Sequence, residues 1–338
     1  MKLLSLVIPC YNSQDYMERC IHTLLTGGTD VEILIINDGS TDDTGKIADD
    51  YVSKYPDIVR VIHQLNGGHG EAINAGMRNA EGIYFKVVDS DDWVDIPSYR
   101  KILDVLRNLL ERQCIVDMVI SNFVYDKEGA KHKRNMHYQS VLPENRIFTW
   151  NETGRFKIGQ YLLMHSIIYR TEILKGSGLK LPAHTFYVDN LFASVPLKYV
   201  QNMYYINVDF YHYYIGRKDQ SVNETIMIKR IDQQIEVNKL MLDFLNLGMV
   251  YEKRLRRYLL HYLEIVTAVS NVMLLRSGTM SNLEKKKKLW RYIKEKDCAV
   301  YNRIRWGVLG IFLNLPGLLG RKIPVTIYRI ARKVIGFN

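Results

Sequence analysis

The chain has 338 residues, enough for one large domain with an appendage or for two domains. Its 47% hydrophobic and 24% charged residues are ordinary for a globular protein and exclude disorder over most of the length. The net charge of +10 is unevenly distributed. Residues 1–125 carry 11 Lys and Arg against 19 Asp and Glu, whereas residues 126–338 carry 35 against 17. The two parts of the chain are therefore expected to face different partners.

The basic excess narrows the classes of partner. Positive charge can serve nucleic acid, anionic lipid or phosphorylated substrates. The chain has neither zinc-finger spacing nor an aromatic RNA-binding signature, so we expect no nucleic-acid partner. Its four cysteines form no CxxC pair, which favours free thiols in a reducing compartment. Pro9 stops the N-terminal apolar run too early for a signal peptide, and the expected location is therefore the cytoplasm.

The first 95 residues alternate short apolar runs with helical patterns. Strands are expected at residues 4–8, 31–36, 59–64 and 83–88, and helices at 13–25, 41–55 and 71–79. Alternation of strands rich in Val, Ile and Leu with helices is typical of a parallel sheet covered on both faces. We therefore predict an α/β, Rossmann-like fold with a mostly parallel sheet.

The remainder of the chain is less regular and ends in helices. The patterns predict a helix at 95–113, a strand at 116–125, a loop at 126–158, a strand at 204–214 and helices from 226 to 276. A further basic helix is expected to open at Lys285–Lys288. The predicted organisation is a catalytic domain over 1–225, whose halves are 1–95 and 96–225, followed by a helical region over 226–338.

The tail at 303–338 is basic and amphipathic. Residues 306–320 are apolar but interrupted by Pro316, and they are too few for a membrane span. Residues 281–338 carry 14 Lys and Arg against 3 Asp and Glu. Such a segment suits the surface of an anionic bilayer. The alternative is packing against its own domain or a partner, which includes a homo-oligomer formed through these helices.

Polar side chains follow the first two expected strands, and ligands of an open parallel sheet bind outside the carboxyl ends of its strands. After the first strand come Pro9, Tyr11 and Asn12, where a nicotinamide-binding enzyme has glycines. The Tyr11 ring is suited to lie against a base. After the second strand, Asp38 can accept hydrogen bonds from a base or a ribose, the alternative being a helix N-cap.

The third and fourth expected strands end in two further motifs. Asn66, Gly67 and Gly68 allow the backbone to approach a ligand closely, the alternative being a flexible turn. The run Asp89-Ser90-Asp91-Asp92 places three carboxylates after a buried strand, which is costly unless a cation lies among them. Oxygen ligands of this kind suit Mg²⁺ or Mn²⁺. The alternative is a solvated acidic turn before a helix.

The order of these four motifs resembles the GT-A catalytic domain of family 2 glycosyltransferases, closely over 3–95 and more loosely to about 225. The resemblance implies that Tyr11 packs on the nucleobase, usually uracil, and that Asp38 hydrogen-bonds it. It further implies that Asp89 contacts ribose or sugar and that Asp91 binds the divalent cation, Mn²⁺ or Mg²⁺. The donor-binding residues implied are Pro9, Tyr11, Asn12, Asp38, Asn66, Gly67, Gly68, Asp89, Ser90, Arg217 and Ser221.

The catalytic base is implied by a motif further along the chain. Tyr187–Phe192 resembles the family's E-D-x-x-F, in which the aspartate, here Asp189, takes the acceptor proton. Val188 departs from the pattern, because an acid is usual at that position. The alternative for Asp189 is a helix cap.

A loop that closes over the diphosphate is implied by Tyr213–Ser221. Arg217 in this segment suits phosphate because its planar fork can bond bidentately. His212 and Asp89 are further candidates for the metal site beside Asp91.

These expectations combine into one function. The chain is predicted to transfer a sugar from a nucleotide-sugar, expected to be a UDP-sugar, to a saccharide hydroxyl with inversion. The basic tail suggests a lipid-linked acceptor at the inner membrane face, as in synthesis of a bacterial surface polysaccharide. Two alternatives are a sugar-1-phosphate nucleotidyltransferase, which needs a Gly-rich basic loop after the first strand, and a non-catalytic protein that keeps the fold.

Overall fold

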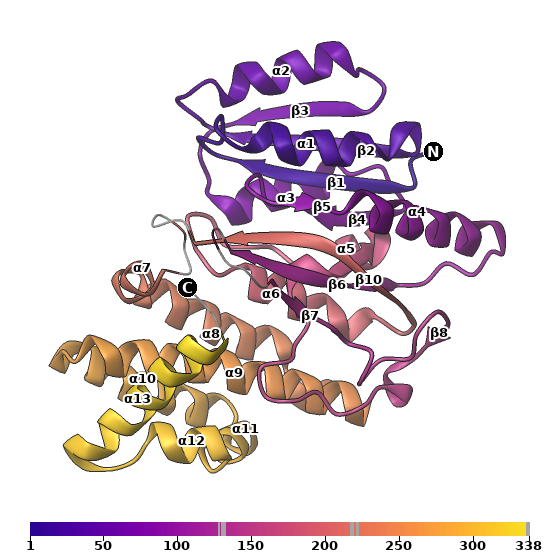
Figure 1. The fold of residues 1–338 in the computed structure, drawn as a ribbon. Coiled ribbons are helices and arrows are strands. Elements are labelled where there is room, and N and C mark those ends of the chain that lie inside the picture. The colour runs from indigo at the N-terminus through magenta and orange to yellow at the C-terminus, as the bar shows by residue number, and fades with distance from the viewer. Residues whose placement is uncertain (128, 130–132, 217–219, 221–222, 336–338) are drawn as a thin grey trace. The chain divides into compact units, whose positions relative to one another are not determined.

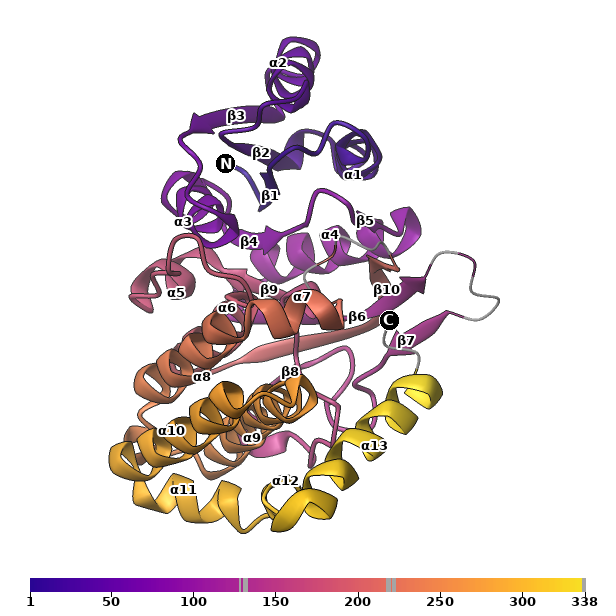
Figure 2. The same cartoon turned by 90° about the vertical axis from the view of Figure 1, so that its left-hand side faces the viewer.

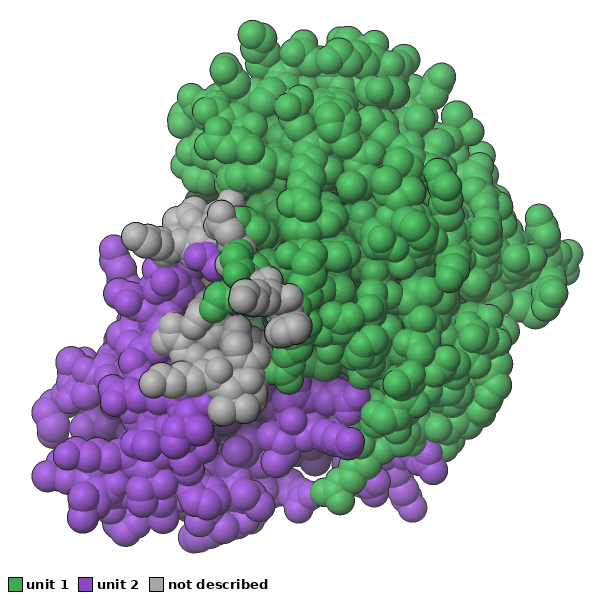
Figure 3. All heavy atoms as spheres, viewed as in Figure 1, with its two compact units in different colours: residues 1–156, 162–215 green, residues 157–161, 216–338 purple. Residues whose placement is uncertain are grey.

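The computed structural model describes residues 1–127, 129, 133–216, 220 and 223–335, and side chains only up to residue 330. The chain forms two compact units: the first comprises 1–156 and 162–215, and the second comprises 157–161 and 216–338 (Figure 3). The division falls at 216, so that residues 216–225 belong to the second unit.

The first unit is built on one sheet with the order β3-β2-β1-β4-β9-β6-β10-β5 (Figure 1). Its strands are β1 (Leu4–Cys10), β2 (Val31–Asp38), β3 (Val59–Gln64), β4 (Tyr84–Val87), β5 (Trp93–Val94), β6 (Met118–Lys127), β9 (Ile167–Arg170) and β10 (Met203–Ile215). Two short strands lie off this path, β7 (Arg134–Met136) on β6 and β8 (Ile147–Phe148) on β10.

The half of the sheet formed by β3, β2, β1 and β4 is parallel throughout. Every residue of β1 and β2 is buried, which accounts for their nearly unbroken apolar sequences. Helices α1 (Met17–Leu25) and α2 (Thr44–Lys54) cover one face, and α3 (His69–Asn79) covers the other (Figure 2). Right-handed crossovers require this arrangement, because the chain moves outward to β3 and then returns past β1 to β4.

The sheet departs from the predicted pattern at β9. This four-residue strand runs antiparallel to both β4 and β6, with Tyr84 opposite Arg170 and Phe85 opposite Tyr169. The predicted loop at 126–158 also contains β7, β8 and a 3-10 turn at Trp150–Glu152. These pieces are too short for periodicity to reveal, since pairing with longer neighbours rather than local sequence makes them strands.

One long helix and two short ones complete the α-helices of the first unit. They are α4 (Ile96–Glu111), α5 (Thr171–Gly176) and α6 (Asp189–Ser194). The predicted start of α4 is confirmed, because the Asp95 carboxylate accepts from the Ser98 N–H at 2.9 Å and Pro97 lies in the first turn.

The second unit is helical, as predicted. Its helices are α7 (Glu224–Lys229), α8 (Ile231–Leu245), α9 (Lys253–Ser277), α10 (Met280–Lys296), α11 (Cys298–Arg305), α12 (Val308–Leu313) and α13 (Gly317–Ile335). Asn246 ends α8 in the left-handed conformation, with φ of 38°. Buried amides join the helices: Asn238 donates to Thr267 at 3.0 Å, and Trp290 donates to Asn271 at 2.8 Å.

Helix α9 is long and apolar enough to cross a membrane by length and composition. However, 67% of its most apolar stretch is buried inside the structure, as in the core helix of a globular unit, so this is weak evidence for a span. The apolar side chains of the tail are different, because many are exposed. They are Trp306, Val308, Ile311, Phe312, Leu318, Leu319, Ile323, Ile327 and Ile330.

Candidate active site at the carboxyl edge of the sheet

The loops after β1 and β2 are tied together at the carboxyl edge of the sheet. Asn12, at φ 49°, donates its N–H to the Ser40 hydroxyl at 3.0 Å and accepts from the Thr41 N–H at 2.9 Å. These bonds fix the backbone immediately after Tyr11, whose ring is 52% exposed. Pro9 lies buried within β1 beside Ile36, one step behind this edge.

Asp38, the last residue of β2, holds the glycine loop through its carboxylate. One oxygen accepts from Gln64 at 2.7 Å and from the Gly67 N–H at 2.8 Å, and the other accepts from the Gly68 N–H at 2.7 Å. Asn66 donates to the Asp38 carbonyl at 2.9 Å. Gly68 has φ of 81°, a conformation that favours glycine. A ligand at Asp38 would therefore share a carboxylate that already shapes the loop.

Asp92 anchors the acidic run to β10. Its carboxylate is fully buried and accepts from the Tyr211 hydroxyl at 2.5 Å and from the Tyr214 N–H at 2.8 Å. The same Tyr211 oxygen accepts from the Asp89 N–H at 3.1 Å. Burial, with the charges of Asp91 and Asp89, raises the pKa of Asp92 well above its ordinary value. Asp92 thus orients its neighbours through bonds that occupy both of its oxygens.

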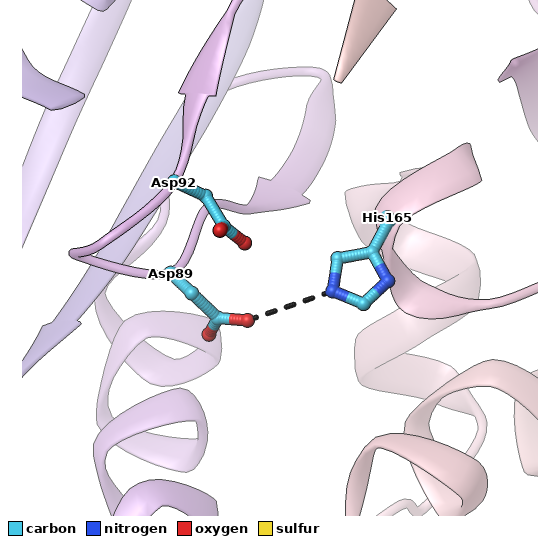
Figure 4. Close-up of side chains that lie close together, drawn as sticks. All are labelled: Asp89, Asp92 and His165. Atoms are coloured by element: carbon cyan, nitrogen blue, oxygen red, sulfur yellow. Dashed lines mark ion pairs between the residues drawn. The ribbon is translucent and has the colours of Figure 1, made fainter. Parts of the chain in front are cut away.

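Asp89 lies between two histidines. Its Oδ1 is 3.6 Å from His69 Nε2. Its Oδ2 is 3.7 Å from His165 Nε2, a pair that Figure 4 shows. Burial by itself would raise the pKa of Asp89, but the neighbouring His165, His69 and Lys86 outweigh it and lower that pKa. Asp89 is therefore ionised at neutral pH.

His165 reaches this edge because β9 is antiparallel to β4. The residue lies in a 3-10 turn, Met164–Ser166, immediately before β9, so the start of β9 meets the end of β4. Its ring is buried and stacks on Tyr213 with centroids 4.3 Å apart, while Tyr211 lies 4.8 Å away. Among the described residues, His165 Nδ1 and Asp89 Oδ1 are buried atoms without a hydrogen-bond partner.

Lys86 supports that turn from β4. Its fully buried ammonium donates to the carbonyls of Met164, His165 and Ile167 at 2.9, 2.6 and 3.2 Å. Burial lowers the pKa of Lys86 to about 7, although the negative charges of Asp89 and Asp92 act in the opposite direction. A charged residue within an apolar strand was the available sequence signal for Lys86, and it was missed.

Asp189 opens α6 and is half-buried. Burial raises the pKa of its carboxyl, an effect that His165 and His69 partly offset and Asp89 reinforces. The two carboxylates and the two histidines therefore lie within electrostatic reach of one another. Asn190 donates to an Asp189 oxygen at 3.2 Å.

The departure at Val188 has a packing explanation. Val188 is fully buried, and a Cβ added at Gly70 would lie 3.4 Å from its side chain, so an apolar residue packs against the start of α3 here. Val188 also occupies the N-cap position of α6, where its apolar side chain makes no capping hydrogen bond. Asp189 lies one residue inside the helix, which disfavours the helix-cap alternative.

Other predicted site residues lie elsewhere or outside the described residues. His212, the further metal candidate, has other partners: its Nδ1 pairs with Asp126 at 3.0 Å and its ring stacks on Trp93 at 5.2 Å. Successive strand residues point to opposite faces, so His212 faces away from its neighbours in β10 that line the acidic run. Ser90 is buried and bonds to Ser13 at 2.9 Å. Arg217 and Ser221 lie outside the described residues.

The donor atoms of this edge fit a divalent cation. Ligand atoms of Asp89, Asp92 and His165 all lie within 4.8 Å of one another. Because both oxygens of Asp92 already accept protein hydrogen bonds, the unpartnered Asp89 oxygen is the better ligand. Asp91 adds a partly buried carboxylate beside it. Carboxylate-rich sites of this kind suit Mg²⁺ or Mn²⁺.

Comparison with known proteins agrees with the fold and the site. Residues 5–171 match the family model described as Glycosyl transferase family 2. The chain is 41% identical over 103 residues to the uncharacterized glycosyltransferase EpsJ of Bacillus subtilis, 30% of each chain. It is 38% identical over 128 residues to chondroitin synthase of Escherichia coli, 38% of this chain and 18% of that one. The chain thus spans less than a third of the length of these two relatives.

Two solved structures share the fold. S. aureus TarS 1–349 in complex with UDP-GlcNAc has a TM-score of 0.53 at 20% identity, covering 90% of each chain. The mannosyltransferase PcManGT of Pyrobaculum calidifontis, in complex with GDP-Man and Mn²⁺, has a TM-score of 0.53 at 13% identity, covering 96% of this chain and 86% of that one.

The mixed, mostly parallel sheet with its acidic strand end defines a nucleotide-sugar-binding fold of GT-A type. The chain belongs to glycosyltransferase family 2.

The Tyr211 hydroxyl is predicted to stabilise the acidic run. Tyr211→Phe leaves the buried Asp89 N–H and Asp92 carboxylate each short of a partner, which costs about 1–3 kcal/mol. We expect the free energy of unfolding in urea to fall by that amount. Tyr99→Phe is the matched control, because the buried Tyr99 hydroxyl has no hydrogen-bond partner among the described residues. Equal losses in the two variants would contradict the anchoring role.

Proposed function

We propose that this chain transfers a sugar from a nucleotide-sugar, UDP-linked in the simplest case, to a hydroxyl of a saccharide acceptor with inversion. The observation that carries the proposal is the grouping of Asp89 with Asp189 around His69 and His165. A donor carboxylate and a candidate base then lie within electrostatic reach of the same two histidines at the carboxyl edge of the sheet. The solved relatives with UDP-GlcNAc and GDP-Man support a nucleotide-sugar donor.

In this proposal the strand-end loops bind the donor. The exposed Tyr11 ring covers the base, while Asp38 and the Gly67–Gly68 backbone lie along the nucleoside. Asp89 accepts a hydrogen bond from ribose or sugar. Asp91 and Asp89 would hold the divalent cation, which neutralises charge on the departing diphosphate when bound. The loop after β1 has no glycine or basic residue for phosphate, which disfavours a nucleotidyltransferase.

Asp189 is the proposed general base. It takes the proton of the acceptor hydroxyl as that oxygen forms its bond to the anomeric carbon. The bond from the anomeric carbon to the diphosphate breaks on the opposite face, and the nucleotide leaves with the bonding electrons. Because the exchange is a single displacement, it inverts the anomeric configuration and needs no covalent enzyme intermediate.

The second unit is proposed to bind an anionic membrane surface. In α12 and α13, exposed apolar side chains such as Leu318, Leu319 and Ile323 alternate with exposed Arg321 and Lys322. A helix with this pattern lies in the interface of an anionic bilayer. A peripheral location of this kind would suit a lipid-linked acceptor.

Asp91→Asn is expected to remove the cation-dependent part of nucleotide affinity. Calorimetry with UDP should show that the gain on adding Mn²⁺ falls by about tenfold or more, which is about 1.4 kcal/mol. Asp49→Asn, an exposed carboxylate of α2, serves as control and should bind like the parent protein. An unchanged Mn²⁺ effect in Asp91→Asn would remove that residue from the metal site.

Asp189→Asn is expected to retain UDP binding and lose about 10²–10⁴-fold in kcat. The pH profile provides a second check. A base acts when deprotonated, so kcat should fall as pH drops through the raised pKa of Asp189, with the acidic limb above the usual value of about 3.9. A variant with nearly parental turnover would exclude Asp189 as the base.

Paired substitution of Leu318→Glu and Leu319→Glu tests the membrane surface. Burying a leucine side chain contributes about 1.5–3 kcal/mol, so binding to phosphatidylglycerol vesicles should weaken by more than about tenfold. The control is Tyr251→Glu, since Tyr251 is 85% exposed but lies outside α12 and α13. Equal co-sedimentation of both variants with the vesicles would refute this surface.

A further inference from the structure

We propose that Lys86 is a positioning residue, which fixes the turn Met164–Ser166 so that His165 stays beside Asp89 and near Asp189. The inference rests on the proposed function and deepens it, because it adds a residue pair that governs the geometry of the transfer step. His165 would border the reacting groups, and Lys86 would act only through it.

The contacts of Lys86 are concentrated on this turn. Its three donated hydrogen bonds reach the carbonyls of Met164, His165 and Ile167, which match the three protons of an ammonium group. Bonds from a charged donor are roughly twice as strong as neutral ones. The backbone on both sides of His165 is thereby held to β4, three residues before Asp89.

A lysine is an unusual choice for this position. β4 is otherwise made of Tyr84, Phe85 and Val87, and Lys86 is completely buried among apolar strands. An apolar side chain would fill the strand without the cost of burying a charge. The lysine adds hydrogen-bond donors for the carbonyl groups of the turn Met164–Ser166. Its ammonium also lies 4.8 Å from the centroid of the Tyr211 ring.

The turn that Lys86 holds places one imidazole next to Asp89 and within electrostatic reach of Asp189. His165 Nε2 is 3.7 Å from Asp89 Oδ2, and the same ring acts electrostatically on Asp189. Tyr213 and Tyr211 pack on the ring and limit its rotation. Its Nδ1 is buried and has no hydrogen-bond partner in the described structure, so the ring is held by its packing and by the backbone of its turn. A shift of this turn would move His165 relative to both carboxylates.

A double-mutant cycle tests the coupling. Lys86→Met conserves the side-chain volume and removes the donors, and His165→Gln removes the imidazole. We expect each variant to lose about a hundredfold in kcat with little change in donor KM, as for a misplaced reacting group. If Lys86 acts through His165, the double variant is no slower than His165→Gln. Multiplied losses in the double variant would overturn the proposal.

Lys2→Met is the matched control, because Lys2 also donates hydrogen bonds to backbone carbonyl groups. Lys2 donates to the carbonyls of Thr29 and Asp57 at 2.8 and 2.6 Å, before the start of β1 and away from the carboxyl edge. It should keep the parental kcat. If Lys86→Met does not fold, Lys86→Arg, which keeps charge and donors in a different geometry, replaces it in the same cycle with the same criterion.

A second readout does not depend on turnover. The imidazole signals of His165 in a ¹⁵N-histidine spectrum are assigned by their loss in His165→Gln. They should shift or broaden in the Lys86 variant and stay unchanged in Lys2→Met. Unchanged signals in the Lys86 variant would overturn the positioning role. If the parent protein transfers sugar from no donor, the proposed function fails, while this spectrum still decides the role of Lys86.

Discussion

The carboxyl edge of this sheet depends on how three carboxylates are held at the end of a buried strand. Asp92 is fixed by Tyr211 and the β10 backbone, and Asp89 is flanked by two histidines. A buried charge persists only where charges or hydrogen bonds compensate for lost hydration. The segments that border the acidic run supply compensating groups. Strand β10 provides hydroxyl and amide donors, and the turn before β9 provides an imidazole. Strand β4 provides the ammonium that holds this turn in place.

The same edge separates two kinds of polar group. Asp38 and Asn12 accept hydrogen bonds from backbone N–H groups of neighbouring loops. These bonds set the shape of the surface around the exposed Tyr11. Asp89 and His165 instead keep buried atoms unpartnered among the described residues. The loops around Tyr11 are held by hydrogen bonds within the protein, so they need not rearrange when a polar ligand binds.

Each unit offers a different chemistry. The first carries the acidic edge on a rigid sheet. The second combines a helical core, joined by buried amides, with a terminal pair of helices whose apolar side chains stay exposed beside arginine and lysine. The charge imbalance along the sequence agrees with the roles proposed for the two units, since a donor site with a divalent cation favours carboxylates and an anionic surface favours basic residues.

The sequence by itself determined the order of strands and helices in the first 113 residues apart from the two-residue β5, together with the strand-end motifs and the helical character of the C-terminal region. Long apolar periods and turn chemistry are local signals. Tertiary structure decided the rest. The reversal at β9 brings His165 beside Asp89 and gives Lys86 its partners, and no local pattern records a pairing between strands so distant in the chain. His212, a further metal candidate in the sequence, pairs with Asp126 instead, and strand side chains alternate between faces, so that one residue's difference in register decides which group meets the site.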